Sequence, residues 1–300
     1  MSVHSAILFT PANRKCWIPP VGLINFAVNT ACKTFIGTLP DLLKSAFIGR
    51  FFAYYLLLFL CSFPHTSNAC DSRAYDRTAS ARHIIDGDTL VLSDGRKLRL
   101  IGIDTPELAR KGRPAESGTD AARLYLSKLL KDKDRLGLKY GPERKDRHGR
   151  LLAHLFLEDG SNIQAGLLRE GLALPLNIPP NVLFSDCYEE QMLLARAAGR
   201  GLWQLPQFQT IRAKSMQPDT HGYRLVHGVV SKLGFSDSAV WLNLNKHLAI
   251  RIRRKHLSYL AGLDLNNIIG AEIEVRGVIY QRNKQMRVSV RHKNDLKILK

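Results

Sequence analysis

The sequence predicts a β-rich α+β protein: a five-stranded OB-fold barrel with three helices, followed by a second small all-β, OB-like domain. Two observations predict this fold class. Short runs of alternating hydrophobicity recur over residues 80–205, mixed with stretches of helical spacing. Further alternating runs, separated by turn residues, fill residues 223–300. Five short strands with a few helices are the content of a small OB barrel.

The first domain is expected over residues 80–205. Its alternating runs lie at 84–85, 90–92, 98–101, 136–140 and 151–157, and the glycine-containing loop 93–96 predicts a hairpin. Apolar residues at helical spacing predict helices over 119–131, 162–170 and 186–198. Gly199 suits the C-cap of the last helix, and Trp203 is expected to close the domain.

The second domain is expected over residues 223–300, after a polar linker at 206–222. Five segments alternate with a period of two, at 225–230, 239–244, 248–252, 271–280 and 286–290, and a helix is expected near 256–262. Residues 211–300 hold 17 basic and 6 acidic residues, whereas residues 70–210 hold 22 and 19. Most of the chain's net charge of +18 therefore lies in its C-terminal third.

A basic surface of this size indicates a polyanion or an anionic membrane as partner. The favoured interpretation is a nucleic-acid-binding face beside Trp241 and Tyr280. The alternatives are outward residues of amphipathic strands, or contact with an anionic cell envelope. The basic residues concerned are Arg251, Arg253, Arg254, Lys255, Arg282, Lys284, Arg287, Arg291 and Lys293.

Residues 1–69 are typical of a leader. The segment Phe51–Phe63 is thirteen residues without a charge, preceded by basic residues, and Ser67–Ala69 has the small-x-small pattern of a cleavage site. A bilayer span needs about 20 apolar residues, so this segment suits a signal peptide better than a transmembrane helix. We therefore expect an exported protein, whether secreted, periplasmic or envelope-anchored, with a signal anchor as the alternative. The atypical residues before Lys44 favour a translation start near Leu42 or Leu43.

Cys70 and Cys187 are the cysteines that remain beyond the leader. They could pair in an oxidising compartment, or Cys70 could carry a lipid as the first residue of the mature chain. Neither cysteine has the spacing of a zinc ligand.

The residues that carry chemistry gather in three motifs, Ile85–Thr89, Arg99–Glu107 and Asp146–Arg150. Asp88 and Asp104 are hard oxygen ligands of the kind that Ca²⁺ prefers, and the Thr105 carbonyl can complete one side. Glu107 lies three residues after Asp104, where it can orient or deprotonate a water.

Arg99 and Arg150 can grip a phosphate through their planar guanidinium groups. Each motif has a structural explanation when taken alone, since Asp-Gly is a common turn and Thr-Pro-Glu a common helix start. Together and in this order, the three motifs predict hydrolysis of a phosphodiester.

This combination of motifs resembles the thermonuclease (staphylococcal-nuclease-like) family over about residues 80–205. The similarity continues through Gln164–Ala173 to Gly199–Trp203. It implies an OB barrel with three helices and an endonuclease that cuts DNA and RNA, commonly with one Ca²⁺ ion. It also implies roles for individual residues: metal ligation by Asp88, Asp104 and the Thr105 carbonyl, Glu107 as general base, and Arg99 and Arg150 as phosphate clamps. Arg147 and His148 occupy a loop that we expect to contact the nucleotide.

The chain departs from the family pattern at Asn177 and Pro179, where members present tyrosines to the bound nucleotide. A stacking platform for a base is therefore expected to be missing there. The expected partners are DNA and/or RNA, and we expect a monomer. The alternative function is a catalytically silent nucleic-acid-binding OB-fold protein of the cell envelope, which the complete set of catalytic side chains disfavours.

Overall fold

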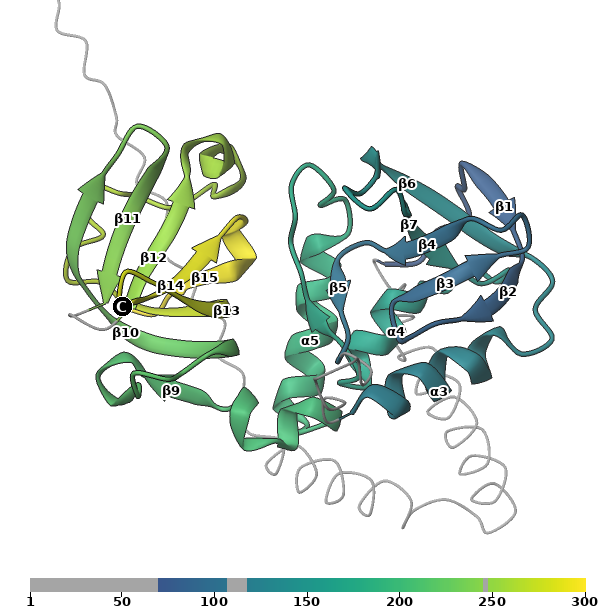
Figure 1. Cartoon of the computed structure of the whole chain (residues 1–300), viewed down its shortest axis with the longest axis horizontal. Coiled ribbons are helices and arrows are strands. Elements are labelled where there is room, and N and C mark those ends of the chain that lie inside the picture. Colours follow the sequence, from purple (N-terminus) through teal and green to yellow (C-terminus); the bar gives the residue numbers. More distant parts are fainter. Residues whose placement is uncertain (1–69, 107–117, 245–247) are drawn as a thin grey trace, which may run out of the picture. The chain divides into compact units, whose positions relative to one another are not determined.

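The computed structural model describes residues 70–106, 118–244 and 248–300 (Figure 1). The expected leader at 1–69 and the expected general base Glu107 lie outside these residues. The described residues belong to one compact unit, Ser67–Lys300, and hold two β-barrels. No helix among them is long and apolar enough to cross a membrane.

The strands of the first barrel are β1 (Arg77–Ala79), β2 (Ala81–Ile84), β3 (Thr89–Leu92), β4 (Lys97–Leu100), β6 (Leu136–Lys145) and β7 (Leu151–Phe156). The pair β1 and β2, separated by Ser80, acts as one strand that changes partner, because β1 pairs with β6 and β2 pairs with β3. The ring continues through antiparallel β3–β4, parallel β4–β7 and antiparallel β7–β6. The predicted five-position barrel is therefore present.

Three α-helices accompany this barrel in the described residues: α3 (Thr119–Leu130), α4 (Ile163–Arg169) and α5 (Ser185–Ala197) (Figure 1). They agree with the helices that the sequence predicts, to within a residue at each end. The side chain of Asn162 caps α4 by accepting a hydrogen bond from the Ala165 N–H. Gly199 follows α5 with φ +58°, a left-handed conformation that favours glycine at a helix end.

The second barrel consists of β10 (Gly222–Phe235), β11 (Ala239–Leu244), β12 (Leu248–Arg253), β13 (Glu272–Arg282) and β14 (Gln285–Val290). The first half of β10 pairs with β13 and its second half with β11. The ring closes through antiparallel β11–β12, parallel β12–β14 and antiparallel β14–β13. This order of pairing, with its single parallel step, repeats that of the first barrel.

Several short elements differ from the expectations. The range 206–222 contains the strand β9 (Thr210–Arg212), which pairs with β10, and β15 (Leu296–Ile298) pairs with β13. The helix expected near 256–262 is present in part: the chain forms the 3₁₀ helix η4 (Arg254–Tyr259), which begins directly after β12 and ends before Gly262.

The two barrels contact each other through α5. Leu225 of β10 is fully buried in the core of the first barrel. The guanidinium of Arg276, itself 7% exposed, pairs with Glu189 of α5, with 2.9 Å between Nη1 and Oε1. Arg196 of α5 pairs with Glu274 at 2.7 Å, and its hydrogen bond lowers the pKa of that carboxyl. Buried side chains and ion pairs of both barrels therefore form one continuous interface.

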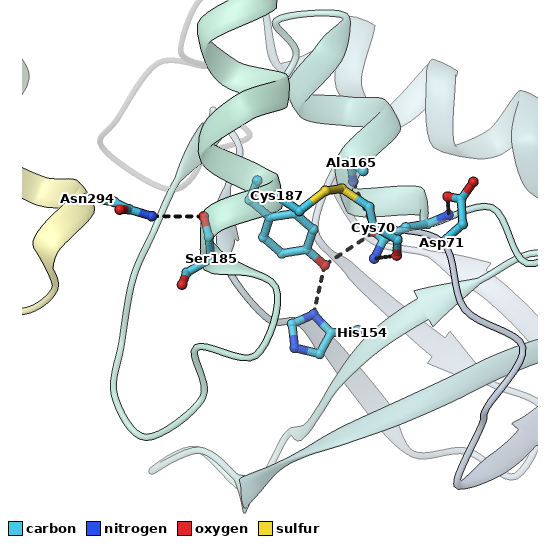
Figure 2. The surroundings of a disulfide bond; sticks show 9 residues. Cys70, Asp71, His154, Ala165, Ser185, Cys187 and Asn294 are labelled. Atoms are coloured by element: carbon cyan, nitrogen blue, oxygen red, sulfur yellow. Dashed lines mark hydrogen bonds between the residues drawn. A yellow bond between two sulfur atoms is a disulfide. The ribbon is translucent and has the colours of Figure 1, made fainter. Parts of the chain in front are cut away.

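A disulfide joins Cys70, before β1, to Cys187 in α5, with the two Cα atoms 5.6 Å apart (Figure 2). Beside it, the hydroxyl of buried Tyr188 lies 2.8 Å from Nδ1 of His154 and donates to the side chain of Asn162 at 3.2 Å. The amide of Asn162 in turn donates to the Cys70 carbonyl at 3.2 Å. The disulfide and these hydrogen bonds tie the beginning of the domain to α5 and β7.

We expect reduction of this disulfide to lower the free energy of unfolding by about 2–4 kcal/mol, since it closes a long loop in the unfolded chain. Urea unfolding with and without dithiothreitol measures the effect. The Cys187→Ser variant is the control, because reductant should no longer change its midpoint. Equal urea midpoints for the unaltered protein with and without dithiothreitol would contradict a stabilising Cys70–Cys187 disulfide.

Burial lowers the pKa of His154 to about 3, whereas an unfolded chain titrates near the ordinary value of about 6.5. Below about pH 6.5 the unfolded chain therefore binds a proton that the folded protein excludes, and stability falls as the pH falls toward 3. Near pH 5 the expected loss relative to neutral pH is about 2 kcal/mol. Urea unfolding at neutral pH and at pH 5 measures this loss. In His154→Gln, the free energy of unfolding should change between the two pH values by about 2 kcal/mol less than in the unaltered protein. An unchanged pH dependence would refute the role of His154.

Candidate active site

The β3–β4 hairpin brings the first two motifs together. Thr89, at the start of β3, pairs with Arg99 of β4, and the Leu100 N–H donates to the Asp88 carbonyl at 2.8 Å. Asp104 ends β5 (Ile103–Asp104), a two-residue strand that pairs with β8 (Leu174–Pro175). Local strand pairing thus places the two predicted carboxylates on either side of one arginine.

The carboxylate of Asp88 is buried, at 5% exposure, and both of its oxygens are engaged. Oδ2 accepts hydrogen bonds from the N–H and the hydroxyl of Thr105, at 2.9 and 3.0 Å. Oδ1 accepts one from the hydroxyl of Thr89 at 2.9 Å and lies 3.2 Å from Nε of Arg99. A buried carboxylate needs such partners, so Thr89, Thr105 and Arg99 are fixed around it.

Arg99 links the two predicted metal ligands. Its Nη2 lies 2.7 Å from Oδ1 of Asp104, while Nε faces Asp88. Nη1 donates to the carbonyls of Leu100 and Ile103, at 2.9 and 2.8 Å. Within the described residues, three of the five N–H groups of the guanidinium donate hydrogen bonds, and a fourth, that of Nε, faces Asp88 in an ion pair. Arg99 therefore organises the carboxylates and has one Nη2 N–H beyond these contacts.

Arg150 is held by the residue that opens its own motif. Its Nε lies 2.7 Å from Oδ2 of Asp146, and Oδ1 of Asp146 accepts the backbone N–H groups of His148 and Arg150, both at 2.9 Å. Burial would raise the pKa of Asp146, but these hydrogen bonds hold it below its usual range. Nη1 of Arg150 reaches the Thr89 hydroxyl at 3.4 Å. Two of its five N–H groups are engaged in these contacts.

A continuous chain of contacts therefore joins all three motifs. It runs from Asp146 through Arg150 and Thr89 to Asp88, and then through Arg99 to Asp104. The sequence prediction missed Thr89 and Asp146 as members. Two signals could have indicated them: Asp146 stands four residues before Arg150, and Thr89 adjoins Asp88 in the first motif.

A third carboxylate, Asp86, adds negative charge beside this network. Its Oδ1 accepts the Asp88 N–H at 3.1 Å. Burial, and then the charge of Asp88, raise the pKa of Asp86. An accumulation of carboxylates that disfavours its own ionisation suits a cation.

The expected ligands are hard oxygens of the kind that Ca²⁺ prefers, but both oxygens of Asp88 already accept hydrogen bonds or face Arg99. In the part of the chain that the structure describes, no three or more His, Cys, Asp or Glu side chains gather as a metal site. The expected set is smaller, with two carboxylates and the Thr105 carbonyl, and Ca²⁺ completes such sets with waters. Asp104, with a side chain 48% exposed, opens this set to solvent.

Residues 97–205 match the family model described as staphylococcal nuclease homologue. The chain is 34% identical over 126 residues to the thermonuclease of Staphylococcus intermedius. The aligned segment covers 41% of this chain and 74% of that relative. It is 32% identical over 136 residues to the thermonuclease of Staphylococcus hyicus, covering 44% and 79%. The chain belongs to the staphylococcal nuclease family. It is also 32% identical over 134 residues to endonuclease YncB of Bacillus subtilis (strain 168), covering 43% and 62%.

The family site opens into a cleft of about 540 Å³. Its lining includes Arg99, Arg147, His148 and Arg150, so the loop residues predicted to contact a nucleotide face the same space as the two arginines. Arg291 of the second barrel also lines this cleft. Arg291 therefore borders the site, although it lies outside the segment that the staphylococcal nuclease model matches.

A second hollow, of about 260 Å³, lies beside Asp104. Tyr280 and Arg291 of the second barrel line it, together with Asn177 of the first. The sequence predicts Tyr280 and Arg291 on a separate binding face, because nothing in the local pattern shows which residues of one barrel meet the other.

Asn177 contacts the second barrel rather than the cleft. Its side chain is buried and donates from Nδ2 to Oδ1 of Asp295 at 2.9 Å. The other oxygen of Asp295 accepts the backbone N–H groups of Arg291 and His292, at 2.9 and 3.1 Å. A position where staphylococcal nuclease relatives are expected to present a tyrosine thus holds the turn that carries Arg291.

Proposed function

We propose that this chain is an endonuclease that hydrolyses phosphodiester bonds in DNA and/or RNA with one divalent ion, Ca²⁺. Its family membership makes it a nuclease, a hydrolase that acts on ester bonds. The observation that carries the finer proposal is the network that joins two carboxylates and two arginines at one cleft.

Asp88, Asp104 and the Thr105 carbonyl would hold the ion. A bound Ca²⁺ would supply charge neutralisation at the phosphate and favour ionisation of a water. The protein's own contribution is to fix these oxygens in advance, through the hydrogen bonds that Thr89 and Thr105 donate to Asp88.

The two arginines take unequal parts in binding the phosphate. Arg99 engages four N–H groups with the carboxylates and two carbonyls, so it presents one N–H to a phosphate and acts mainly through its charge. Arg150 engages two and is 30% exposed, so it has more N–H groups to offer. We assign Arg150 as the main clamp and Arg99 as the organiser of the carboxylates, with Arg147 and His148 beside the nucleotide.

We assign Glu107 as the general base. It follows Asp104 by three residues, so the chain cannot carry it far from the carboxylate pair. A carboxylate at this distance that is not a direct ligand can accept the proton of the attacking water.

We further propose that the protein is exported and monomeric, and that its second barrel is OB-like. The disulfide between Cys70 and Cys187 supports export, since disulfides persist in oxidising compartments. The shared order of strand pairing supports the OB-like assignment. Export as a secreted, periplasmic or envelope-anchored protein would allow the basic barrel to contact an anionic envelope.

The deciding experiment is cleavage of plasmid DNA and of RNA with Ca²⁺ and with EDTA. We expect cleavage with the ion and none with the chelator. Glu107→Gln and Arg150→Ala should each lower the rate by at least about 10²-fold, the effect of removing one base or one charge-stabilising donor. No cleavage by the unaltered protein with any divalent ion would favour a silent nucleic-acid-binding protein. Near-normal rates in both variants would mean that their roles are misassigned.

Arg291→Ala should raise KM roughly 10-fold and change kcat little, because Arg291 lines the cleft but stands outside the network of the three motifs. Steady-state cleavage of a labelled oligonucleotide separates the two parameters. Lys297→Ala is the matched control: it removes the same charge from an exposed residue of β15. Equal KM values in the two variants would remove Arg291 from the substrate site.

A further inference from the structure

The second barrel has a groove of its own. It measures about 910 Å³ and lies over the outward positions of β10, β11, β12 and β14. We call it the Trp241 groove. Its lining includes Lys232, Phe235, Trp241, Asn243, Gln285 and Arg287, and among the described residues it holds no acidic side chain. It shares no lining residue with the cleft at the active site or with the hollow beside Asp104.

Two guanidinium groups flank the indole of Trp241. Trp241 pairs with Arg251 across β11 and β12, and the Arg251 guanidinium carbon lies 5.6 Å from the ring centroid. The guanidinium carbon of Arg287, on β14, lies 4.9 Å from the same centroid. Nε of both arginines lacks a hydrogen-bond partner among the described residues. The strands thus hold two cations against the indole, and the unpartnered Nε atom of each is buried.

The aromatic groups of this groove differ in exposure. Phe235 is 63% exposed, whereas Trp241 is partly exposed. On β10, the residue paired with Trp241 is Gly234, which has no side chain to cover the indole. A Cβ placed at Gly234 would lie 3.8 Å from Cβ of Trp241, an ordinary van der Waals contact.

We propose that the Trp241 groove binds a single-stranded segment of nucleic acid, at a distance along the strand from the bond that is cut. Bases stack on Trp241 and Phe235, and phosphates lie near Arg287 and Lys232, the two basic side chains of the lining. Single strands offer base faces for stacking, whereas in a duplex those faces are covered by neighbouring base pairs. The identity of the ligand rests on the proposed nuclease function, whereas the geometry of the groove is independent of that function.

Charge complementarity favours this occupant over an acidic protein surface. The lining combines cations with aromatic faces, which match the alternation of phosphate and base along a single strand. Held beside the nuclease barrel, the groove would keep a long strand bound while the active site cuts it.

The test uses the whole chain in EDTA, which separates binding from cleavage, and a fluorescein-labelled oligothymidylate of about 12 nucleotides. Fluorescence anisotropy should show Trp241→Ala binding about 10-fold more weakly, the effect of losing one base–aromatic stack. Trp241→Phe, which keeps an aromatic face, should bind within about 3-fold of the unaltered protein. Lys297→Ala is the control for an exposed change elsewhere on the barrel. Equal affinities for Trp241→Ala and Lys297→Ala overturn the proposal.

The salt dependence of binding gives a second readout. The double variant Lys232→Ala/Arg287→Ala should flatten the slope of log affinity against log salt concentration by about 1.4, since each phosphate contact with a single strand contributes about 0.7. A Lys297→Ala/Lys300→Ala variant, which loses the same charge at exposed positions of the C-terminus, should keep its slope. Equal slopes in the two double variants count against phosphate contacts in the groove.

Vesicles of phosphatidylglycerol test the membrane alternative. If Trp241→Ala loses vesicle binding and keeps oligonucleotide binding, the groove serves a membrane and the proposal is overturned. Cleavage is assayed separately with Ca²⁺. Trp241→Ala could lose oligonucleotide binding while no form of the protein cleaves nucleic acid. That result would support nucleic-acid binding by the groove and refute the proposed catalysis. Thermal unfolding of each variant verifies that it is folded. If Trp241→Ala does not fold, Trp241→Phe still gives a decisive test.

Discussion

The burial of one carboxylate, that of Asp88, constrains the whole active site. A buried negative charge is tolerated only where hydrogen bonds and an opposite charge replace water. Thr89, Thr105 and Arg99 supply these partners, and they come from three consecutive segments of the chain. The hairpin β3–β4 and the strand β5 therefore cannot shift independently, and Arg150 is connected through the same threonine.

The interface between the barrels depends on a related constraint. Arg276 is almost fully buried and is stabilised by Glu189 of α5, so separating the barrels would expose or unpair that charge. Because the Cys70–Cys187 disulfide anchors α5 on its other side, the helix holds the second barrel and the start of the first at once. Arg291 reaches the cleft from this fixed position.

Much of the fold follows from local pattern, because period two and period 3.6 are imposed by each element separately. Both barrels and helices such as Thr119–Leu130 were predictable on that basis, and so was the grouping of Asp88, Arg99 and Asp104, which lie in or next to the consecutive strands β3, β4 and β5. The contacts of Asn177 with Asp295 and of Arg291 with the cleft were not. They depend on how surfaces more than a hundred residues apart fit together, and no spacing in the sequence encodes that.

The two barrels show how one order of strands supports two kinds of site. In each, the third strand of the ring carries an arginine opposite a residue of the second strand: Arg99 opposite Thr89, and Arg251 opposite Trp241. In the first barrel the arginine lies between two carboxylates, which engage its donors and make it part of a charged centre. In the second it lies against an indole and keeps an unused donor. The neighbours of the arginine, and not the barrel, therefore decide whether this position belongs to a charged centre or to an aromatic surface.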